Sequence, residues 1–294
     1  MTMRYYADHN GSLPNVQNSS ASAVITRLKA ALVTGYGDKP AAGWELLYES
    51  LNNPDDPANR LAVRSKDVAG DRMVFHFSEV VNGLDVQMAR DWDSVNHKPI
   101  DVYVSGKWQK QLGGGNPADR LNTGSLGVIA DSKSCWVSVG YCLQFFGTFD
   151  YINPMQPKDI ILFGTHYDYL DNEEHILPQR YVAESSRRKF NDQFLGSYVV
   201  ESPGNNQYWF NGGSVPRLLR EGDVPYIQKI KIWHNPVARP SGENWYYAGH
   251  IPGLVFSPCK ITTGDKVVID GNEKTLIQFD SYGTYNQVFM VDEA

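Results

Sequence analysis

The 294-residue sequence has few cysteines, no long apolar run and no signal-peptide pattern in residues 1–10. Its three cysteines, Cys135, Cys142 and Cys259, are odd in number and lack Cys-x-x-Cys spacing, which argues against a disulfide scaffold or a zinc ribbon. No apolar run approaches the ~20 residues of a membrane-spanning helix, and residues 1–10 lack the apolar segment of a signal peptide. We therefore expect no membrane insertion, and free thiols in a reducing cytoplasm.

Charged residues are also scarce. Asp, Glu, Lys and Arg make up 20% of the chain, against about a quarter in an average protein, and the net charge is −6. The densest basic segment is the short run Arg187-Arg188-Lys189, whereas a surface that binds nucleic acid needs clustered cations to neutralise phosphates. The sequence therefore predicts that nucleic acid is not the main partner.

Aromatic and turn-forming residues are plentiful instead. Aromatic residues account for 12% and apolar residues for 41% of the chain, which is enough to build a hydrophobic core. The chain has 26 Gly and 16 Pro, together about 14% against ~12% on average. This balance favours β structure over a bundle of helices.

One helix is predicted near the start of the chain. Its apolar positions recur at helical spacing, as expected for an amphipathic helix; they are Ala21, Val24, Ile25, Leu28 and Leu32. Its polar face is expected to carry Thr26, Arg27 and Lys29. Residues 18–20 can supply the N-cap, and Gly35 is placed as the C-cap residue.

Short apolar or alternating runs separated by turn signals predict strands through the rest of the chain. The expected strands are 61–64, 72–77, 84–89, 100–104, 126–130, 134–139, 160–163, 227–233, 254–256, 266–269, 275–279 and 287–291. Asn82-Gly83 is a candidate hairpin turn. The predicted fold class is therefore α+β and β-dominated, with antiparallel sheets and one N-terminal amphipathic helix packed on them.

The pattern also suggests a domain organisation. Residues 1–169 are predicted to form the helix plus an antiparallel β domain. Residues 170–245 are more polar and less periodic, and are interpreted as an irregular insertion or elaborated loop region, with possible helix near 182–190. Residues 246–294 are expected to form C-terminal strands that complete the same or a second β domain.

No catalytic motif is recognised, and the best metal candidate is a loop. The Gly113–Gly115 run lacks the Lys and the spacing of a phosphate-binding loop. Residues 166–175 hold two imidazoles and four carboxylates, and the candidate ligands are His166, Asp168, Asp171 and His175. Their spacing fits no known metal cassette, so an acidic, solvated loop is the preferred interpretation. We expect no catalytic residue, metal or cofactor.

Three further groups of residues have structural interpretations. Cys135 and Cys142 lie in apolar strand sequence, which favours buried thiols over a nucleophile. His76 lies between two Phe residues, which favours a packed histidine on a sheet face over a base. Two aromatic clusters could form a subunit interface, a carbohydrate platform or ordinary core; they are Tyr208, Trp209 and Phe210, and Trp245, Tyr246 and Tyr247.

Four segments carry a more specific pattern. After Tyr5-Tyr6, the predicted helix ends in Leu28-Lys29-Ala30-Ala31-Leu32-Val33-Thr34-Gly35-Tyr36-Gly37 and leads into Ala41-Ala42-Gly43-Trp44. The second segment is Asn59-Arg60-Leu61-Ala62-Val63-Arg64. The third is Ser134-Cys135-Trp136-Val137-Ser138-Val139, followed by an aromatic strand ending in Gly147-Thr148-Phe149. The fourth is Gly249-His250-Ile251-Pro252-Gly253-Leu254, with Gly264-Asp265-Lys266 after it.

In this collinear order the four segments resemble a group of uncharacterised virion structural proteins of tailed bacteriophages. The third segment departs from that group's G-D-F triplet, because Thr148 stands in place of the Asp. The resemblance implies a non-enzymatic component of the phage particle, in the neck, tail, baseplate or capsid surface, with the first three favoured. It brings no catalytic residues with it.

The resemblance also implies partners and a location. The expected partners are other virion proteins, with the chain acting as a homo-oligomer or as copies on a symmetric ring. We expect it to be made and assembled in the cytoplasm of the host bacterium. Two other functions stay open: a module on the particle that binds host-surface glycans, using Trp209, Trp245 and neighbouring tyrosines, and a metal-dependent hydrolase centred on His166, Asp168 and His175.

Overall fold

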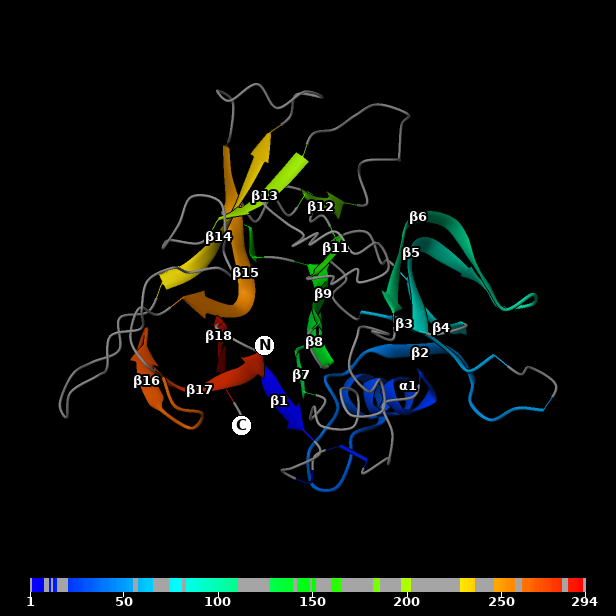
Figure 1. The fold of residues 1–294 in the computed structure, drawn as a ribbon, viewed down its shortest axis with the longest axis horizontal. Helices are drawn as coiled ribbons and strands as arrows, with labels where there is room; N and C mark the ends of the chain where they lie inside the picture. Colours follow the sequence, from blue (N-terminus) through cyan, green and yellow to red (C-terminus); the bar gives the residue numbers. More distant parts are fainter. Residues whose placement is uncertain are drawn as a thin grey trace, which may run out of the picture.

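The structure is a computed structural model of the 294-residue chain (Figure 1). It describes residues 2–7, 11, 13–14, 21–54, 58–65, 74–80, 83–109, 127–139, 142–148, 150–151, 160–164, 182–185, 197–201, 228–235, 246–256, 261–281 and 285–292. Within this part of the chain the structure is dominated by antiparallel β-sheet, with a single helical segment.

The helical segment is an α-helix, α1 (Ala21–Lys29), that continues as a π-helical turn, η1 (Ala30–Thr34). The strands, in chain order, are β1 (Arg4–Ala7), β2 (Glu45–Ser50), β3 (Arg60–Arg64), β4 (Val74–Val80), β5 (Gly83–Asp93), β6 (Lys98–Gln109), β7 (Gly127–Ala130), β8 (Ser134–Val139), β9 (Cys142–Thr148), β10 (Asp150–Tyr151), β11 (Ile160–Gly164), β12 (Val182–Ser185), β13 (Ser197–Glu201), β14 (Gln228–Asn235), β15 (Tyr246–Phe256), β16 (Lys266–Ile269), β17 (Asn272–Ser281) and β18 (Tyr285–Val291).

The strands form two sheets. The smaller is a meander of five strands in the order β2-β3-β4-β5-β6. The larger has thirteen strands, and runs from β1 through β7, β8, β9, β11, β12, β13, β14, β15, β18 and β17 to β16, with β10 paired to β15. All of these pairings are antiparallel.

One hydrophobic core lies between the two sheets and includes the helical segment. Its residues come from β1, from the helical segment, from the small sheet and from β7 to β9. Aromatic rings join the sheets directly, because Phe146 of β9 lies 5.0 Å from Phe75 and 5.3 Å from Phe77, both of β4. Trp44 completes the group at 5.6 Å from Phe146. The two sheets and the helical segment are therefore parts of one packed unit.

The helical segment is more deeply buried than the predicted pattern implies. No residue from Ala21 to Val33 is exposed, and the partly buried Ser22, Thr26, Lys29 and Val33 recur at helical spacing along one stripe. Arg27, predicted to lie on a polar face, is buried, and its Nε donates a hydrogen bond to the carbonyl of Pro14 at 3.2 Å. Gly35 ends the segment as predicted, with φ +75° and its N–H bonded to the carbonyl of Ala30.

The predicted strands are largely confirmed where the structure describes them. Residues 134–139 and 266–269 match β8 and β16 end to end. The hairpin predicted at Asn82-Gly83 joins β4 and β5, but Gly83 is already the first residue of β5 and is paired with Val80. β1, β2, β10 and β13 had no counterpart among the predicted strands. The prediction of helix near 182–190 is wrong at its start, because β12 lies there and pairs with β13. Strands β12, β13 and β14 all fall within residues 170–245.

The opposite face of β7, β8 and β9 packs against the C-terminal strands. Trp136 lies 4.9 Å from Phe145 and 5.2 Å from Phe289 of β18. Its indole N–H donates to the carbonyl of Pro252 in β15 at 2.8 Å. Figure 1 shows β1, β17 and β18 together near the two ends of the chain. The β7–β9 part of the large sheet is therefore covered on both faces.

Candidate functional site

The candidate site is located by the alternation of side chains in β3 and β4, which point in turn to the two sides of the small sheet. Leu61 and Val63 of β3, and Phe75 and Phe77 of β4, point into the shared core. Residues of opposite parity therefore project from the other side of the small sheet. We call this side the outer face, and its residues considered below are Tyr48, Arg60, Ala62, Arg64, Val74, His76 and Gln87. Asp91 and Trp92 of the β5–β6 hairpin lie against it.

The far half of the β5–β6 hairpin folds over the outer face. A β-bulge between Met88 and Ala89 interrupts the pairing with β6, and bulges bend and twist a strand; Figure 1 shows the two strands curving together. Beyond the bulge, Trp92 packs against Ala62 and Val74. The carboxylate of Asp91 forms an ion pair with Arg64. The hairpin thus covers polar and apolar residues of β3 and β4.

Stacked rings hold the hairpin in place. Tyr48 of β2 stacks with Trp92, at 5.7 Å between ring centres and 30° between planes, and with His97, at 4.2 Å and 22°. His76 of β4 lies 5.2 Å from Trp92. The Arg60 guanidinium lies 5.9 Å from the centre of the Tyr48 ring, and its Nη1 donates to the carbonyl of His97. Such ring and cation–π contacts contribute roughly 0.5–1.5 kcal/mol each.

The tip of the hairpin is shaped by Asp93. Its Oδ1 accepts hydrogen bonds from the backbone N–H groups of Val95 and Asn96 at 2.9 and 3.0 Å, and its Oδ2 accepts one from the Asn96 side chain at 2.7 Å. The Asn96 side-chain hydrogen bond is the largest of the causes that lower the pKa of Asp93. His97 adopts φ +52°, which presents its ring to Tyr48.

Four nitrogen atoms of the outer face are buried without a hydrogen-bond partner. They are Nε of Arg60, Nε of Arg64, Nε2 of His76 and Nε1 of Trp92. They are all such side-chain atoms found in the part of the chain that the structure describes. A buried polar atom left without a partner costs roughly 1–3 kcal/mol. Their concentration on one face marks it as the candidate site.

The imidazole of His76 is held in a definite state. Its Nδ1 lies 3.1 Å from Oε1 of Gln87, and because an amide oxygen accepts, Nδ1 carries the proton and Nε2 is the open position of the neutral ring. Burial lowers the pKa of His76, and the positive charge of Arg60 acts in the same direction. The bond to Gln87 and the charge of Asp85 oppose that shift. His76 is therefore a packed sheet-face histidine, as the sequence predicted, and it is 6% exposed.

Two other buried titratable groups lie at the β7–β8 turn. Asp131 accepts hydrogen bonds on Oδ1 from the N–H groups of Lys133 and Ser134 and from the Ser134 hydroxyl, each at 2.8 Å. Cys135 is a buried, free thiol, and burial raises its pKa well above the usual value, with a further contribution from Asp131. A thiol in this environment is a poor nucleophile, in line with the prediction of a buried structural cysteine.

Most of the site residues predicted from sequence lie outside the described residues. These are His166, Asp168, Asp171 and His175 of the metal candidate, and Tyr208, Trp209, Phe210 and Trp245 of the aromatic candidates. Tyr246 and Tyr247 lie in β15, paired with His234 and Trp233 of β14. The glycan-binding and metal-hydrolase hypotheses therefore stay predictions.

Sequence reasoning found His76 but missed its neighbours. In the sequence, Arg60 and Arg64 stand only within the segment Asn59–Arg64, and Trp92 lies outside the predicted strands. The available signal was the Arg-x-Ala-x-Arg alternation, which places two cations on one face around a small residue. Folding of the hairpin over that face depends on contacts distant in sequence.

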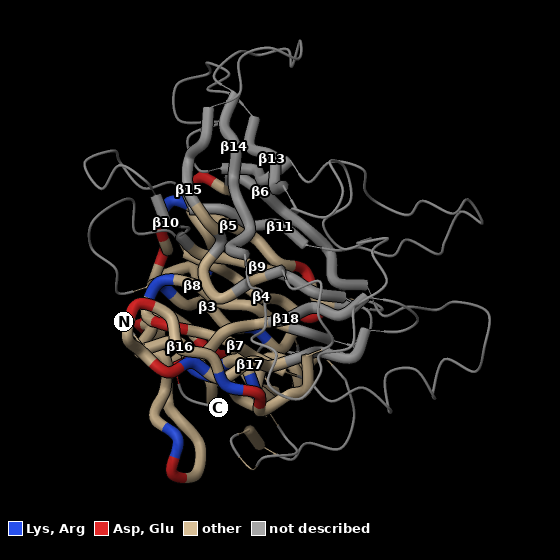
Figure 2. Tube along the Cα trace, turned by 90° about the vertical axis from the view of Figure 1, so that its left-hand side faces the viewer, with Lys and Arg blue, Asp and Glu red and all other residues tan. Residues whose placement is uncertain are grey.

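Within the ranges given above, no group of three or more His, Cys, Asp or Glu residues is arranged to hold a metal ion. In the same ranges, no helix is both long and apolar enough to cross a membrane. Figure 2 shows Lys and Arg interspersed with Asp and Glu along the described trace. Comparison with protein-family models, with curated proteins and with solved structures finds no match.

Proposed function

We propose that this chain is a non-enzymatic structural component of a tailed-bacteriophage virion, and that it assembles through protein–protein interfaces. The observation that carries the proposal is the packing of the segments on which the resemblance depends. The first three of these segments contribute residues to the shared core: Tyr6, Leu28, Leu32, Trp44, Leu61, Val63, Cys135 and Val137. The segments therefore support one another in a single scaffold.

The proposed component is an oligomer or a set of copies on a ring, in the neck, tail or baseplate. Exposed apolar side chains offer a place for such contacts, because interface cores are richer in apolar residues than the surrounding rim. Three of them share the β5–β6 hairpin: Val95 at the tip, which is 83% exposed, and Ile100 and Val102 of β6. We assign the hairpin to contacts with neighbouring virion proteins.

Immunogold electron microscopy of purified particles, with antibody to this chain, tests the proposal. Label at the neck, tail or baseplate is expected, and mass spectrometry should find peptides of the chain in the same particles. Particles that carry neither label nor peptides would overturn the proposal.

A matched pair of substitutions tests the role of the hairpin. Val95→Asp should reduce incorporation into particles severalfold, because a charge at an interface core is costly to desolvate. Val268→Asp in β16 is the control, since Val268 is also exposed, at 71%, but lies away from the hairpin. Incorporation is measured by quantitative mass spectrometry of particles after complementation in trans. Equal incorporation of the two variants would exclude the hairpin as the contact.

A further inference from the structure

We propose that Arg64, His76 and Trp92 form a binding site for one small inorganic anion of halide size, and that the anion binds together with a proton. The site lies on the outer face, beneath the β5–β6 hairpin. The inference is independent of the proposed virion function, because it depends only on the chemistry of this face.

The three side chains are neighbours on the outer face. Ala62 of β3 is paired with His76 of β4, and Val74 is paired with Arg64. Arg64 is therefore a diagonal cross-strand neighbour of His76 on the same face of the sheet. Trp92 packs on both small side chains between them, Ala62 and Val74, and its ring lies 5.2 Å from His76. The open nitrogen atoms of all three residues thus belong to one small area of the outer face.

Two of these nitrogen atoms are N–H donors in every state of the protein. Nε of Arg64 and Nε1 of Trp92 have no acceptor, and neither group can give up its proton at ordinary pH. Trp92 is 8% and His76 is 6% exposed, so bulk water does not replace the missing partner. A monatomic anion suits this arrangement, since it accepts N–H bonds from several directions and needs little room between packed rings.

The local charge favours an anion once His76 is protonated. Arg60 and Arg64 contribute two positive charges on β3, and His76 is the titratable group of β4 between them. The facing strand β5 contributes Asp85 and Asp91, of which Asp91 is paired with Arg64 and is largely exposed. His97 lies at the hairpin tip against Tyr48. Protonation of His76 would leave the face with a net positive charge next to the buried donors.

Proton binding follows from the state of His76. In the neutral ring Nε2 presents a lone pair, which repels an anion, because Nδ1 holds the proton toward Gln87. Once the ring is protonated, Nε2–H becomes a third donor beside Nε of Arg64 and Nε1 of Trp92. The lowered pKa of His76 means that the anion stabilises a protonated form that the empty site disfavours. Affinity should therefore rise as pH falls.

The full-length protein, labelled with ¹⁵N, is titrated with sodium chloride at pH 7.5 and at pH 5.5, with sodium gluconate as the control of equal ionic strength. The probe is the indole N–H resonance of Trp92, assigned from its loss in Trp92→Phe. We expect a saturable shift with chloride at pH 5.5, absent with gluconate. From pH 7.5 to pH 5.5 the apparent Kd for chloride should fall by up to about tenfold per pH unit, which is the limit when binding is linked to one proton.

Substitutions separate a direct contact from a structural effect. His76→Gln should abolish the pH dependence of chloride binding. Arg64→Lys keeps the charge but lacks the Nε–H donor, and should weaken binding at least tenfold. Lys266→Met removes an exposed cation in β16 and should leave binding unchanged.

Two outcomes would overturn the proposal. One is the absence of a saturable chloride response at pH 5.5, which would mean that a buried water satisfies these atoms. The other is a response that persists in full in both Arg64→Lys and His76→Gln, which would place the ion elsewhere. Should a variant fail to fold, bromide soaked into crystals of the unaltered protein at pH 5.5 provides the direct test. An anomalous peak between Arg64 and Trp92 is expected, and its absence would contradict the proposal.

Discussion

Asp131 illustrates at the scale of one residue how burial and hydrogen bonding compete. Its backbone carbonyl accepts the indole N–H of Trp44 at 2.7 Å, and its side chain closes the β7–β8 turn through three bonds to Oδ1. These bonds favour the carboxylate, but burial outweighs them, so the pKa of Asp131 is raised above 3.8. The residue therefore ties the turn to the core at the cost of a buried negative charge.

We predict that Asp131→Asn is tolerated and that its effect depends on pH. Asparagine keeps an oxygen at Oδ1 for all three donors, whereas Asp131→Ala leaves those donors without an acceptor and should cost roughly 1–3 kcal/mol. Because the folded-state pKa is raised, the contribution of Asp131 to stability is fully present below pH 3.8 and is lost as pH rises through the folded-state pKa. The stability of Asp131→Asn relative to the unaltered protein should therefore increase as pH rises from 3.8 through the folded-state pKa of Asp131.

Urea denaturation of the three proteins at several pH values between 3.5 and 7 is the measurement. A free-energy difference between native protein and Asp131→Asn that stays constant with pH would contradict the assignment. Equal losses in the alanine and asparagine variants would show that the Oδ1 bonds contribute little.

At the scale of elements, alternation and turn chemistry made much of the sheet predictable. In β3 and β4, apolar residues at every second position are typical of a strand with one buried face, and Phe75 and Phe77 lie in the core. At the β16–β17 turn, Asp270-Gly271 is a typical two-residue hairpin pair, and Ile269 is paired with Asn272. In these cases the determinants lie within a few residues of each other.

Other features depend on contacts that local sequence does not contain. Arg27 was predicted to be on a polar face, yet its burial is made possible by the carbonyl of Pro14, thirteen residues earlier. The candidate site on the outer face depends on the bulge after Met88, because Trp92 beyond the bulge packs against Ala62. Neither the bulge nor its direction follows from the periodicity of β5.

The connection after the helical segment gives a prediction at this scale. Gly35 and Gly271 adopt nearly the same backbone angle, φ +75° and +77°. A Cβ on Gly35 would lie 2.9 Å from the carbonyl oxygen of Lys39, whereas a Cβ on Gly271 would meet nothing within 4 Å. Gly271→Ala should therefore cost only the strain of a left-handed residue, about 1–2 kcal/mol.

Gly35→Ala should cost clearly more than Gly271→Ala, because the clash is with backbone that holds the 36–39 turn. Thermal and urea unfolding of both variants measure the difference. Similar costs at the two positions would mean that the 36–39 turn moves aside freely, and that Gly35 is required for its backbone angle alone.

At the scale of the whole molecule, the strands form two closed circuits. β10 follows β9 with one residue between them and pairs with β15, so that β9 to β15 form a circuit that the chain connection between β9 and β10 closes. A second circuit runs through β1, β7, β8, β9, β10, β15 and β18, and is completed by the chain ends. There the N–H of Asp292 donates to the carbonyl of Met3 at 2.8 Å. This bond lies just before β1, which pairs with β7 and is the last strand of the large sheet at that end, so the C-terminus covers only the start of this sheet edge.

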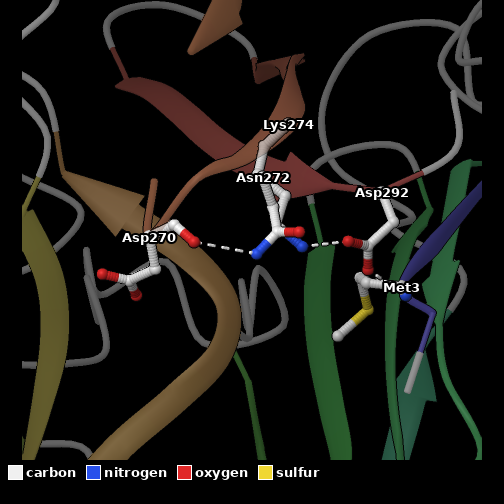
Figure 3. Close-up of polar contacts among 5 residues, drawn as sticks. All are labelled: Met3, Asp270, Asn272, Lys274 and Asp292. Carbon is white, nitrogen blue, oxygen red and sulfur yellow. Dashed lines mark hydrogen bonds and ion pairs between the residues drawn. The ribbon is translucent and has the colours of Figure 1, made fainter. Parts of the chain in front are cut away.

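The contacts between the chain ends combine backbone and charge (Figure 3). The N–H of Met3 donates to Oδ2 of Asp292 at 2.7 Å, and Lys274 of β17 forms an ion pair with Oδ1 of the same carboxylate. One carboxylate thus holds β1, β17 and the end of β18 together. Both side chains of the pair are about a quarter exposed, so water screens them less than a surface pair.

We predict that Lys274→Met destabilises the protein by roughly 1–2 kcal/mol, since it leaves a half-buried carboxylate without its cation. Lys266→Met is the matched control: its ion pair with Glu273 lies on the same β16–β17 hairpin, but both partners are about 60% exposed, and an exposed pair contributes about 0–1 kcal/mol. Urea unfolding gives the two costs, and hydrogen exchange should show faster exchange at the amides of Met3 and Asp292 in Lys274→Met alone. Equal costs with unchanged exchange would show that backbone pairing closes the second circuit without help from the charge.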